Sequence, residues 1–266
     1  MGILANHAHL MPPPVEGGWW PEGGVDLLLK HLDACGIDRA VVFPPFAHQV
    51  ARGMRGANLW ALEAVRKHAD RFIPAGCMSP LAEDALEVLR ILHDEGVRLV
   101  KIHPSVDLHD IAAPEAAQFY AEAEELGMVL DYHTGPHGTR LALATPEKFD
   151  DVACNHPKLR LVFEHIGGRT YFEGFAAILA NHRGRTFGGL ASVFDPEKNW
   201  MWYLDRRELE GLIRCIGAGS FIFGLDFPWN SPDRSRRDIE AIRSLDISER
   251  DKELILGGNL AGLLGT

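Results

Sequence analysis

Short hydrophobic runs alternate with longer segments of helical periodicity along the whole chain. The runs typical of buried strands cover residues 3–8, 39–43, 71–78, 97–103, 128–133, 159–165, 186–193 and 220–226. Segments with the three- and four-residue spacing of amphipathic helices follow them, at 25–35, 57–68, 83–95, 114–126, 146–155, 171–182, 206–216, 233–244 and 249–256. Several of these segments end at a glycine, such as Gly36, Gly96 or Gly127, as helices commonly do. The pattern predicts a repeated strand–helix unit.

Strands separated by helices imply right-handed crossovers and a parallel sheet. Eight units in a chain of 266 residues favour closure into a (β/α)8 TIM barrel, an α/β fold. An open dinucleotide-binding sheet is disfavoured, because the first strand is not followed by a GxGxxG turn. The chain has no linker or composition break, so we expect residues 1–266 to form a single barrel domain.

The composition argues against nucleic acids and membranes as binding partners. The formal net charge is -10, with 27 Lys and Arg against 37 Asp and Glu, which offers no long-range attraction for nucleic acid or an anionic membrane. The four cysteines are scattered without a CxxC pair, which fits a reducing cytoplasm. No apolar run approaches the roughly 18 residues of a membrane span. We therefore expect a cytoplasmic protein acting on a small molecule, with homo-oligomerisation left open.

Polar residues gather where the predicted strands end. In a TIM barrel these ends form one rim that carries the active site. His7 and His9 end the first strand, two residues apart, so that both imidazoles can face the same side. His133 and His165 end the fifth and sixth strands, and Asp226 ends the eighth. The chain therefore places imidazoles and a carboxylate from four strands at one mouth.

This group of residues predicts a metal site. His7, His9, His133 and Asp226 would supply a ligand set that suits Zn²⁺, with Mn²⁺, Fe²⁺ or Co²⁺ possible, and would leave one position open for water or substrate. Asp226 would then accept a proton from the activated water. We expect His165 to act as a base or electrophile beside the ion rather than as a full ligand.

Further candidates lie near the same rim. Lys101 and His103 close the fourth strand and share a face by their spacing, so they are candidates for substrate binding. Aromatic and arginine side chains in the predicted loops would suit a small ring-bearing or carboxylated substrate; they are Trp19, Trp20, Arg140, Arg169, Trp200 and Trp202. The alternative for the tryptophans is helix packing or a subunit contact.

Several motifs resemble the amidohydrolase superfamily, and within it the amidohydrolase-related (amidohydrolase 2) branch of metal-dependent TIM-barrel hydrolases and decarboxylases. The motifs are Asn6-His7-Ala8-His9, the segments 95–104, 156–168 and 223–228, and the C-terminal 256–259. The resemblance covers essentially the whole chain. It implies one divalent ion on His7, His9, His133 and Asp226, with His165 orienting water or the reacting group of the substrate.

The resemblance gives Lys101 a second possible role. In binuclear relatives a lysine on the fourth strand is carboxylated and bridges two metals, so a second metal is expected only if Lys101 is carboxylated. The alternative, which we prefer, is that Lys101 contacts a substrate carboxylate or an acidic neighbour.

Three functions follow from this pattern. The first is a metal-dependent hydrolase that acts on a small amide, ester or lactone through a metal-activated water. The second is a metal-dependent, non-oxidative decarboxylase of a small aromatic or unsaturated carboxylic acid, which would use the same five residues. The third is a non-catalytic metal- or ligand-binding barrel, which the open coordination position disfavours because structural zinc sites are closed.

Overall fold

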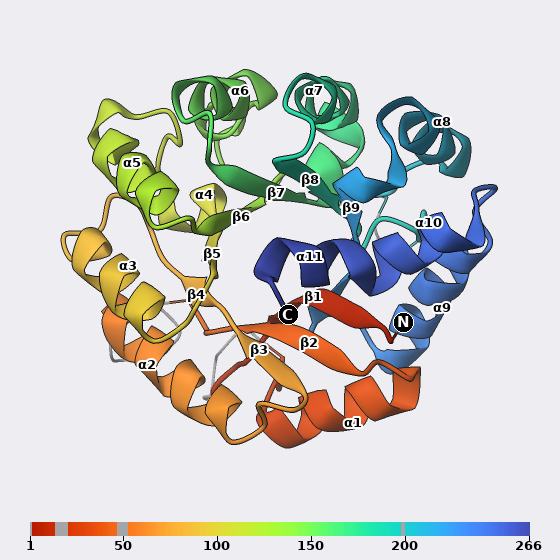
Figure 1. The fold of residues 1–266 in the computed structure, drawn as a ribbon, viewed down its shortest axis with the longest axis horizontal. Coiled ribbons are helices and arrows are strands. Elements are labelled where there is room, and N and C mark those ends of the chain that lie inside the picture. Colours follow the sequence, from red (N-terminus) through yellow and green to blue (C-terminus); the bar gives the residue numbers. More distant parts are fainter. Residues whose placement is uncertain (1, 14–20, 47–52, 198–199) are drawn as a thin grey trace.

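The computed structural model describes residues 2–13, 21–46, 53–197 and 200–266. It is a TIM barrel in which parallel strands form the inner ring and helices form the outer ring (Figure 1). The predicted fold class is therefore confirmed.

The strands pair in two parallel arcs. One arc has the order β10-β1-β2-β3 and the other the order β4-β5-β6-β7-β8-β9. Their bounds are β1 Leu4–His9, β2 Arg39–Phe43, β3 Phe72–Pro74, β4 Gly76–Cys77, β5 Leu99–Ile102, β6 Val129–His133, β7 Arg160–Glu164, β8 Thr186–Gly189, β9 Phe221–Ile222 and β10 Gly224–Phe227.

Two of the predicted strands are broken in the middle. The run 71–78 divides at Ala75 into β3 and β4, and the run 220–226 divides at Phe223 into β9 and β10. In each case one half pairs with one arc and the other half with the other arc. At both breaks the two arcs are therefore joined by the continuous backbone rather than by strand pairing. The Phe223 N–H leaves the sheet and donates to the Ile255 carbonyl, at 3.0 Å.

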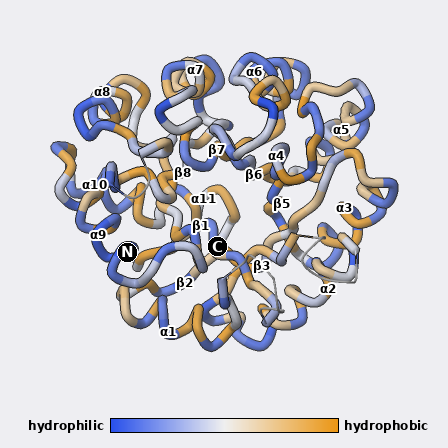
Figure 2. Tube along the Cα trace, turned by 180° about the vertical axis from the view of Figure 1, so that it is seen from behind, coloured by the Kyte–Doolittle hydropathy of each residue, from blue (hydrophilic) through white to orange (hydrophobic). Residues whose placement is uncertain are grey.

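The outer helices lie close to the predicted segments. They are α1 Val25–Cys35, α2 Gly53–Arg66, α3 Ala85–Asp94, α5 Ala117–Glu125, α6 Pro146–Asn155, α7 Gly168–Asn181, α8 Arg206–Ile216 and α9 Pro232–Arg243. Hydrophobic and hydrophilic residues alternate along them (Figure 2). In α8, for example, Leu209, Ile213 and Ile216 are buried, and the Asp205 carboxylate caps the first turn by accepting from the Arg207 and Glu208 N–H groups. Amphipathic spacing thus positions each helix on the ring.

Shorter helices complete the chain. A single helical turn, α4 (Pro104–Asp107), follows β5. The predicted last helix begins as α10 (Glu249–Glu253), passes through an irregular turn at Leu254–Gly258 and continues as α11 (Asn259–Leu264). Figure 1 shows α11 across the centre of the ring. Its Leu260, Leu263 and Leu264 pack in one cluster with Leu4, Leu99 and Val129, which are the first residues of β1, β5 and β6. The N-terminal end of the barrel is therefore closed by α11.

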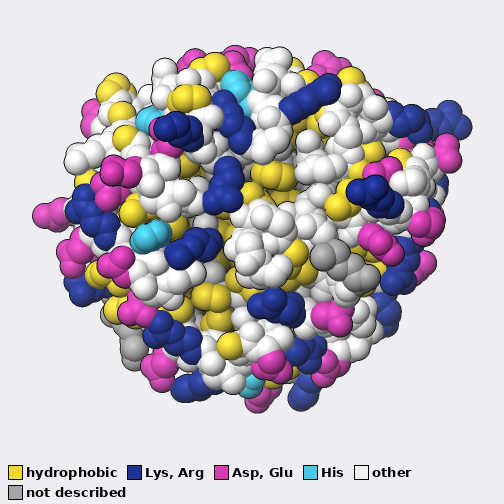
Figure 3. Space-filling model, viewed as in Figure 1, with side chains coloured by type: hydrophobic (Ala, Val, Ile, Leu, Met, Phe, Trp, Pro, Cys, Tyr) yellow, Lys and Arg dark blue, Asp and Glu magenta, His cyan; other side chains and the backbone are white. Residues whose placement is uncertain are grey.

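The surface carries charges of both signs. Figure 3 shows basic and acidic side chains interspersed over the face that includes α11. Within the described ranges, no helix has both the length and the apolar character that crossing a bilayer requires.

Candidate metal centre

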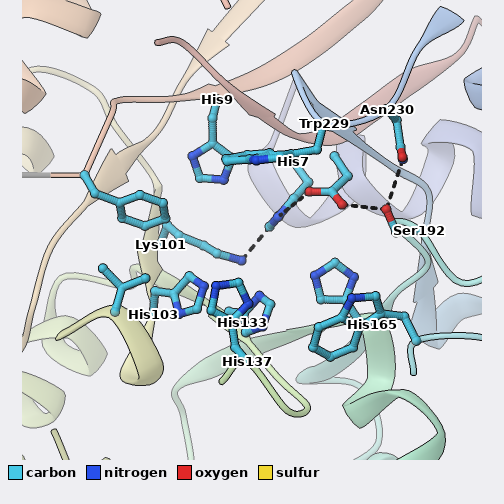
Figure 4. Close-up of a pocket in the computed structure, with 14 residues that line it drawn as sticks. His7, His9, Lys101, His103, His133, His137, His165, Ser192, Trp229 and Asn230 are labelled. Carbon is cyan, nitrogen blue, oxygen red and sulfur yellow. Dashed lines mark hydrogen bonds and ion pairs between the residues drawn. The ribbon is translucent and has the colours of Figure 1, made fainter. Parts of the chain in front are cut away.

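A cavity of about 240 Å³ lies at the end of the barrel opposite α11. Its residues come from the C-terminal ends of the strands and the loops that follow them. They are His7, His9, Phe46, Lys101, His103, Val106, His133, His137, His165, Ser192, Trp202, Asp226, Trp229 and Asn230 (Figure 4). The five residues predicted to form the centre therefore line one cavity, together with Lys101 and His103.

An irregularity in β1 turns two consecutive side chains inward. His7 has a left-handed backbone, with φ of 64°, and the pairing register with β2 shifts between Ala5 and Ala8. The Asn6 side chain donates to Asp131 and to Glu164, at 2.6 Å each, while the neighbouring His7 lines the cavity. A regular strand would send Asn6 and His7 to opposite faces. Both histidines of the HxH pair reach the cavity, and the bulge turns the Asn6 side chain toward the barrel interior as well.

The end of β7 also has two consecutive side chains that point inward. Glu164 is fully buried beneath the cavity, and His165, with φ of 68°, still lines it. Space for the Glu164 carboxyl comes from Gly189 on β8, where a Cβ atom would lie 2.3 Å from that carboxyl. Burial, followed by the negative charge of Asp131, raises the pKa of Glu164 to about 8.

The hydrogen bond of His165 defines its tautomer. Its Nδ1 lies 2.7 Å from the Ala191 carbonyl oxygen, which can only accept, so Nδ1 carries the proton. Burial lowers the pKa of His165. In the neutral ring the Nε2 atom therefore has a lone pair, which can take a proton or hold an ion.

The three predicted histidine ligands, His7, His9 and His133, are also neutral imidazoles. Burial is the main cause in each case: the pKa of His7 and that of His133 lie well below the usual value, and the pKa of His9 falls to about 3. The positive charge of Lys101 adds to the effect at all three. A neutral imidazole has the free lone pair that metal binding requires.

Two further observations fit a divalent ion at this place. His7 Nε2 and Asp226 Oδ1 lie 3.6 Å apart, close to the separation of about 3.4 Å between two ligands of one tetrahedral zinc. His133 Nε2 is buried and has no hydrogen-bond partner among the described residues. An ion would satisfy that atom, and the set of His7, His9, His133 and Asp226 as its ligands stays a prediction.

Lys101 takes part in a buried network below the centre. Its Nζ lies 2.8 Å from Asp131 Oδ1 and 3.3 Å from His7 Nδ1, and its side chain is 0% exposed. Asn6 holds the other oxygen of Asp131 and also reaches Glu164. Lys101 thus already has an acidic neighbour inside the protein, in agreement with the second of the two roles considered for it.

Three histidines form a separate group at one side of the cavity. His103 and His133 stack with ring centres 4.0 Å apart and planes at 10°, and His137 stands nearly edge-on to both. Their nitrogen atoms come within 4.8 Å of one another. The lone pairs of stacked rings lie in two parallel planes, and one ion cannot lie in both planes, so His103 and His133 are poorly placed to share one ion.

The predicted rim residues lie in different places. Trp202 lines the cavity and stacks on His165, with ring centres 5.2 Å apart. Trp200 is 58% exposed, and the Arg169 guanidinium lies over its ring at 4.9 Å, so these two side chains contact each other outside the cavity. Arg140 is exposed and also lies outside the cavity lining. Trp19 and Trp20 fall outside the described residues.

Sequence reasoning missed several residues of the site. Ser192 donates to Asp226 Oδ2 at 2.5 Å, and Asn230 donates to Ser192 Oγ at 3.0 Å. Phe46 and Trp229 lie against His9 and form an aromatic wall. Asp131 had a usable signal, because it stands two residues before His133 on the same strand. Ser192 had none, since a lone serine in a predicted strand carries no positional information.

The family of the chain follows from comparison with known proteins. The family model described as amidohydrolase (Amidohydro_2) matches residues 6–266. The chain belongs to the amidohydrolase family. The resemblance inferred from the five sequence motifs is thereby confirmed. Among curated proteins, no sequence matches this amidohydrolase.

Solved structures with the same fold cover the whole barrel. An uncharacterised TIM-barrel protein from Bordetella bronchiseptica has a TM-score of 0.78 and 19% identity over 100% of this amidohydrolase and 99% of that chain. A 2,6-dihydroxybenzoate decarboxylase from Rhizobium has a TM-score of 0.72 and 18% identity, covering 99% and 98%. A dihydroxybenzoic acid decarboxylase from Polaromonas, with bound manganese, has a TM-score of 0.69 and 15% identity, covering 99% and 97%.

At these identities the structural matches show a shared fold. Membership of the amidohydrolase family, shown by the family match, identifies the chain as a metal-dependent enzyme.

Proposed function

We propose that the protein is a metal-dependent, non-oxidative decarboxylase of a small aromatic or unsaturated carboxylic acid. One observation carries the proposal: the cavity joins neutral imidazoles and the Asp226 carboxylate to flat apolar walls made by Phe46, Trp202 and Trp229. Its volume of about 240 Å³ suits a substrate with a single ring. Two of the structural relatives described above are decarboxylases of dihydroxybenzoates.

His7, His9, His133 and Asp226 would hold one divalent ion in this proposal. Imidazole and carboxylate donors suit Zn²⁺, and a relative with bound manganese keeps Mn²⁺ as the alternative. When bound, the ion would polarise a substrate oxygen and acidify a bound water. Lys101 stays paired with Asp131, which argues against its carboxylation and therefore for one ion rather than two.

Residues of the chain would orient the substrate and transfer the proton. Trp202 and Trp229 flank the cavity on different sides and would hold the plane of an unsaturated substrate. Loss of CO2 leaves the electrons of the broken carbon–carbon bond on the ring carbon, which then needs a proton. Asp226 and His165 face the cavity and are the groups that can move this proton.

Product analysis tests the proposal. Hydroxybenzoates and other unsaturated acids incubated with the metal-loaded protein should release CO2, and the product should carry one solvent hydrogen at the vacated carbon. Asp226→Asn should abolish the release while leaving the fold intact. Metal-loaded protein that releases no CO2 from any such acid would contradict decarboxylation.

Hydrolysis of a small amide, ester or lactone remains a second candidate because of His165. Its Nε2 atom has a lone pair in the cavity, as a base that takes a proton from water requires. Incorporation of ¹⁸O from solvent water into a product, without CO2, would support hydrolysis. The third function inferred from sequence, a non-catalytic barrel, is disfavoured by membership of a family of metal-dependent enzymes.

A further inference from the structure

A chain of two hydrogen bonds ends on the Asp226 carboxylate. Asn230 Nδ2 donates to Ser192 Oγ at 3.0 Å, and Ser192 Oγ lies 2.5 Å from Asp226 Oδ2. Both residues line the cavity and are buried, with exposed fractions of 1% for Ser192 and 4% for Asn230. Figure 4 shows the Ser192 and Asn230 side chains next to each other, on the other side of the cavity from Lys101.

The direction of this chain follows from elementary chemistry. An amide nitrogen only donates, so the Ser192 oxygen accepts from Asn230. The hydroxyl has one proton, which it must then give to Asp226. The backbone carbonyl of Leu225 accepts a second bond from Asn230 Nδ2, at 2.9 Å, and this bond holds the amide in place.

The two oxygens of Asp226 are therefore unequal. Oδ2 accepts a hydrogen bond from the Ser192 hydroxyl, while Oδ1 faces His7 Nε2 at 3.6 Å. The hydrogen bond uses one lone pair of Oδ2 and holds the carboxylate in one orientation, so Oδ1 is the oxygen more available to an ion.

The backbone supports the same arrangement. Ser192 and Asp226 both have left-handed backbones, with φ of 58° and 55°. Such conformations are unfavourable for residues other than glycine and persist where the surroundings impose them. Here they bring the hydroxyl and the carboxylate into contact from two different strand ends.

We propose that Ser192 and Asn230 are positioning residues that restrict Asp226 to binding the metal through Oδ1 alone. This inference rests on the metal site of the proposed function but not on the reaction catalysed there. Neighbours that orient a ligand typically change metal affinity by about 10- to 100-fold when removed. Loss of the hydroxyl would free Oδ2 and change the number or geometry of the ligand atoms.

Cobalt substitution provides a direct test, because the visible spectrum of Co²⁺ depends on its coordination number and geometry. The main variant is Ser192→Gly, since glycine tolerates the left-handed backbone and the fold should survive. The second is Asn230→Asp, which turns the donor to Ser192 into an acceptor and draws the hydroxyl proton away from Asp226. Ser235→Ala is the control, as Ser235 is equally buried and hydrogen-bonded but contacts His31 outside the cavity.

We expect Ser192→Gly and Asn230→Asp to bind one Co²⁺ with an altered spectrum and an affinity changed by about 10- to 100-fold. Ser235→Ala should retain the wild-type spectrum. A wild-type spectrum in both cavity variants would overturn the positioning role while leaving the metal site and its reaction standing. Failure of the unaltered protein to bind Co²⁺ would overturn the positioning role and the metal site together. If both cavity variants show the altered Co²⁺ spectrum but the unaltered protein releases no CO2 from any acid, the positioning role is supported and only the decarboxylase proposal is rejected.

Discussion

At the scale of single residues, the site depends on left-handed backbones at non-glycine positions. His7, His165, Ser192 and Asp226 all have positive φ, and all line the cavity. Alternation and strand ends are enough to predict His7, His9, His133, His165 and Asp226 as neighbours. The sequence does not show which residues will be left-handed, because residue type is a weak guide to such strain. The inward positions of Asn6 and Glu164 therefore could not be predicted.

A second feature at the scale of single residues is the buried ion pair between Lys101 and Asp131. Both side chains are 0% exposed and sit 2.8 Å apart beneath the cavity. Removing one partner of a buried pair leaves an uncompensated charge, which costs far more than losing a surface pair.

We therefore expect Lys101→Met to lower the free energy of unfolding by about 3 to 5 kcal/mol, measured by urea denaturation of the metal-free protein. Adding Asp131→Asn to that variant should recover part of the loss. Lys148→Met, which breaks the more exposed pair with Asp110, is the matched control and should cost less than about 1 kcal/mol. Equal losses in the two single variants would argue against a charged Lys101–Asp131 pair.

At the scale of elements, helices were easier to predict than strand pairing. The outer helices follow the three- and four-residue spacing closely, because that spacing is a local property of the sequence. The breaks at Ala75 and Phe223 were not predicted. Each arises where the chain changes pairing partner, and that change depends on strands distant in sequence.

The contact between α1 and α9 should make stability depend on pH. His31 on α1 is bonded to Ser235 on α9, at 2.8 Å, and burial lowers its pKa to about 4. In the unfolded chain this histidine titrates near 6.5. Between about pH 4 and 6.5 the unfolded state binds more protons, so the stabilisation present at neutral pH is lost as the pH falls through this window.

Replacing His31 by Asn should remove this contribution, which we expect to be about 1 to 2 kcal/mol. The measurement is the free energy of unfolding from pH 4.5 to 7.5, taken as the difference between wild type and variant. That difference should be largest at neutral pH and shrink toward pH 4.5. A difference that does not vary with pH would refute the assignment.

At the scale of the whole molecule, the two ends of the barrel differ: one contributes to stability and the other holds the site. The N-terminal end is closed by apolar side chains of α11, and the opposite end holds the cavity. Leu260 of α11 is fully buried in the closed end. We expect Leu260→Ala to lower the free energy of unfolding by about 2 to 5 kcal/mol without changing the turnover of the folded fraction. A loss of turnover at full folding would show that the two ends are coupled.

Metal binding should stabilise the whole fold, because an ion held by strand ends on both arcs binds only the folded chain. At a free metal concentration 100 times the dissociation constant, the gain is about 2.7 kcal/mol. Thermal denaturation with and without a chelator should show this shift in wild type. Asp226→Asn should show a much smaller one, and an identical shift in the variant would remove Asp226 from the ligand set.

The closed end of the barrel also determines how molecules pass through the site. With α11 across one end, the cavity behaves as a well rather than a channel, and substrate and product have to use the same opening. The product must depart before the next substrate arrives, and a lingering product occupies the place that the substrate needs. Steady-state kinetics should therefore show the ring product as a competitive inhibitor, with an effect that rising substrate concentration removes.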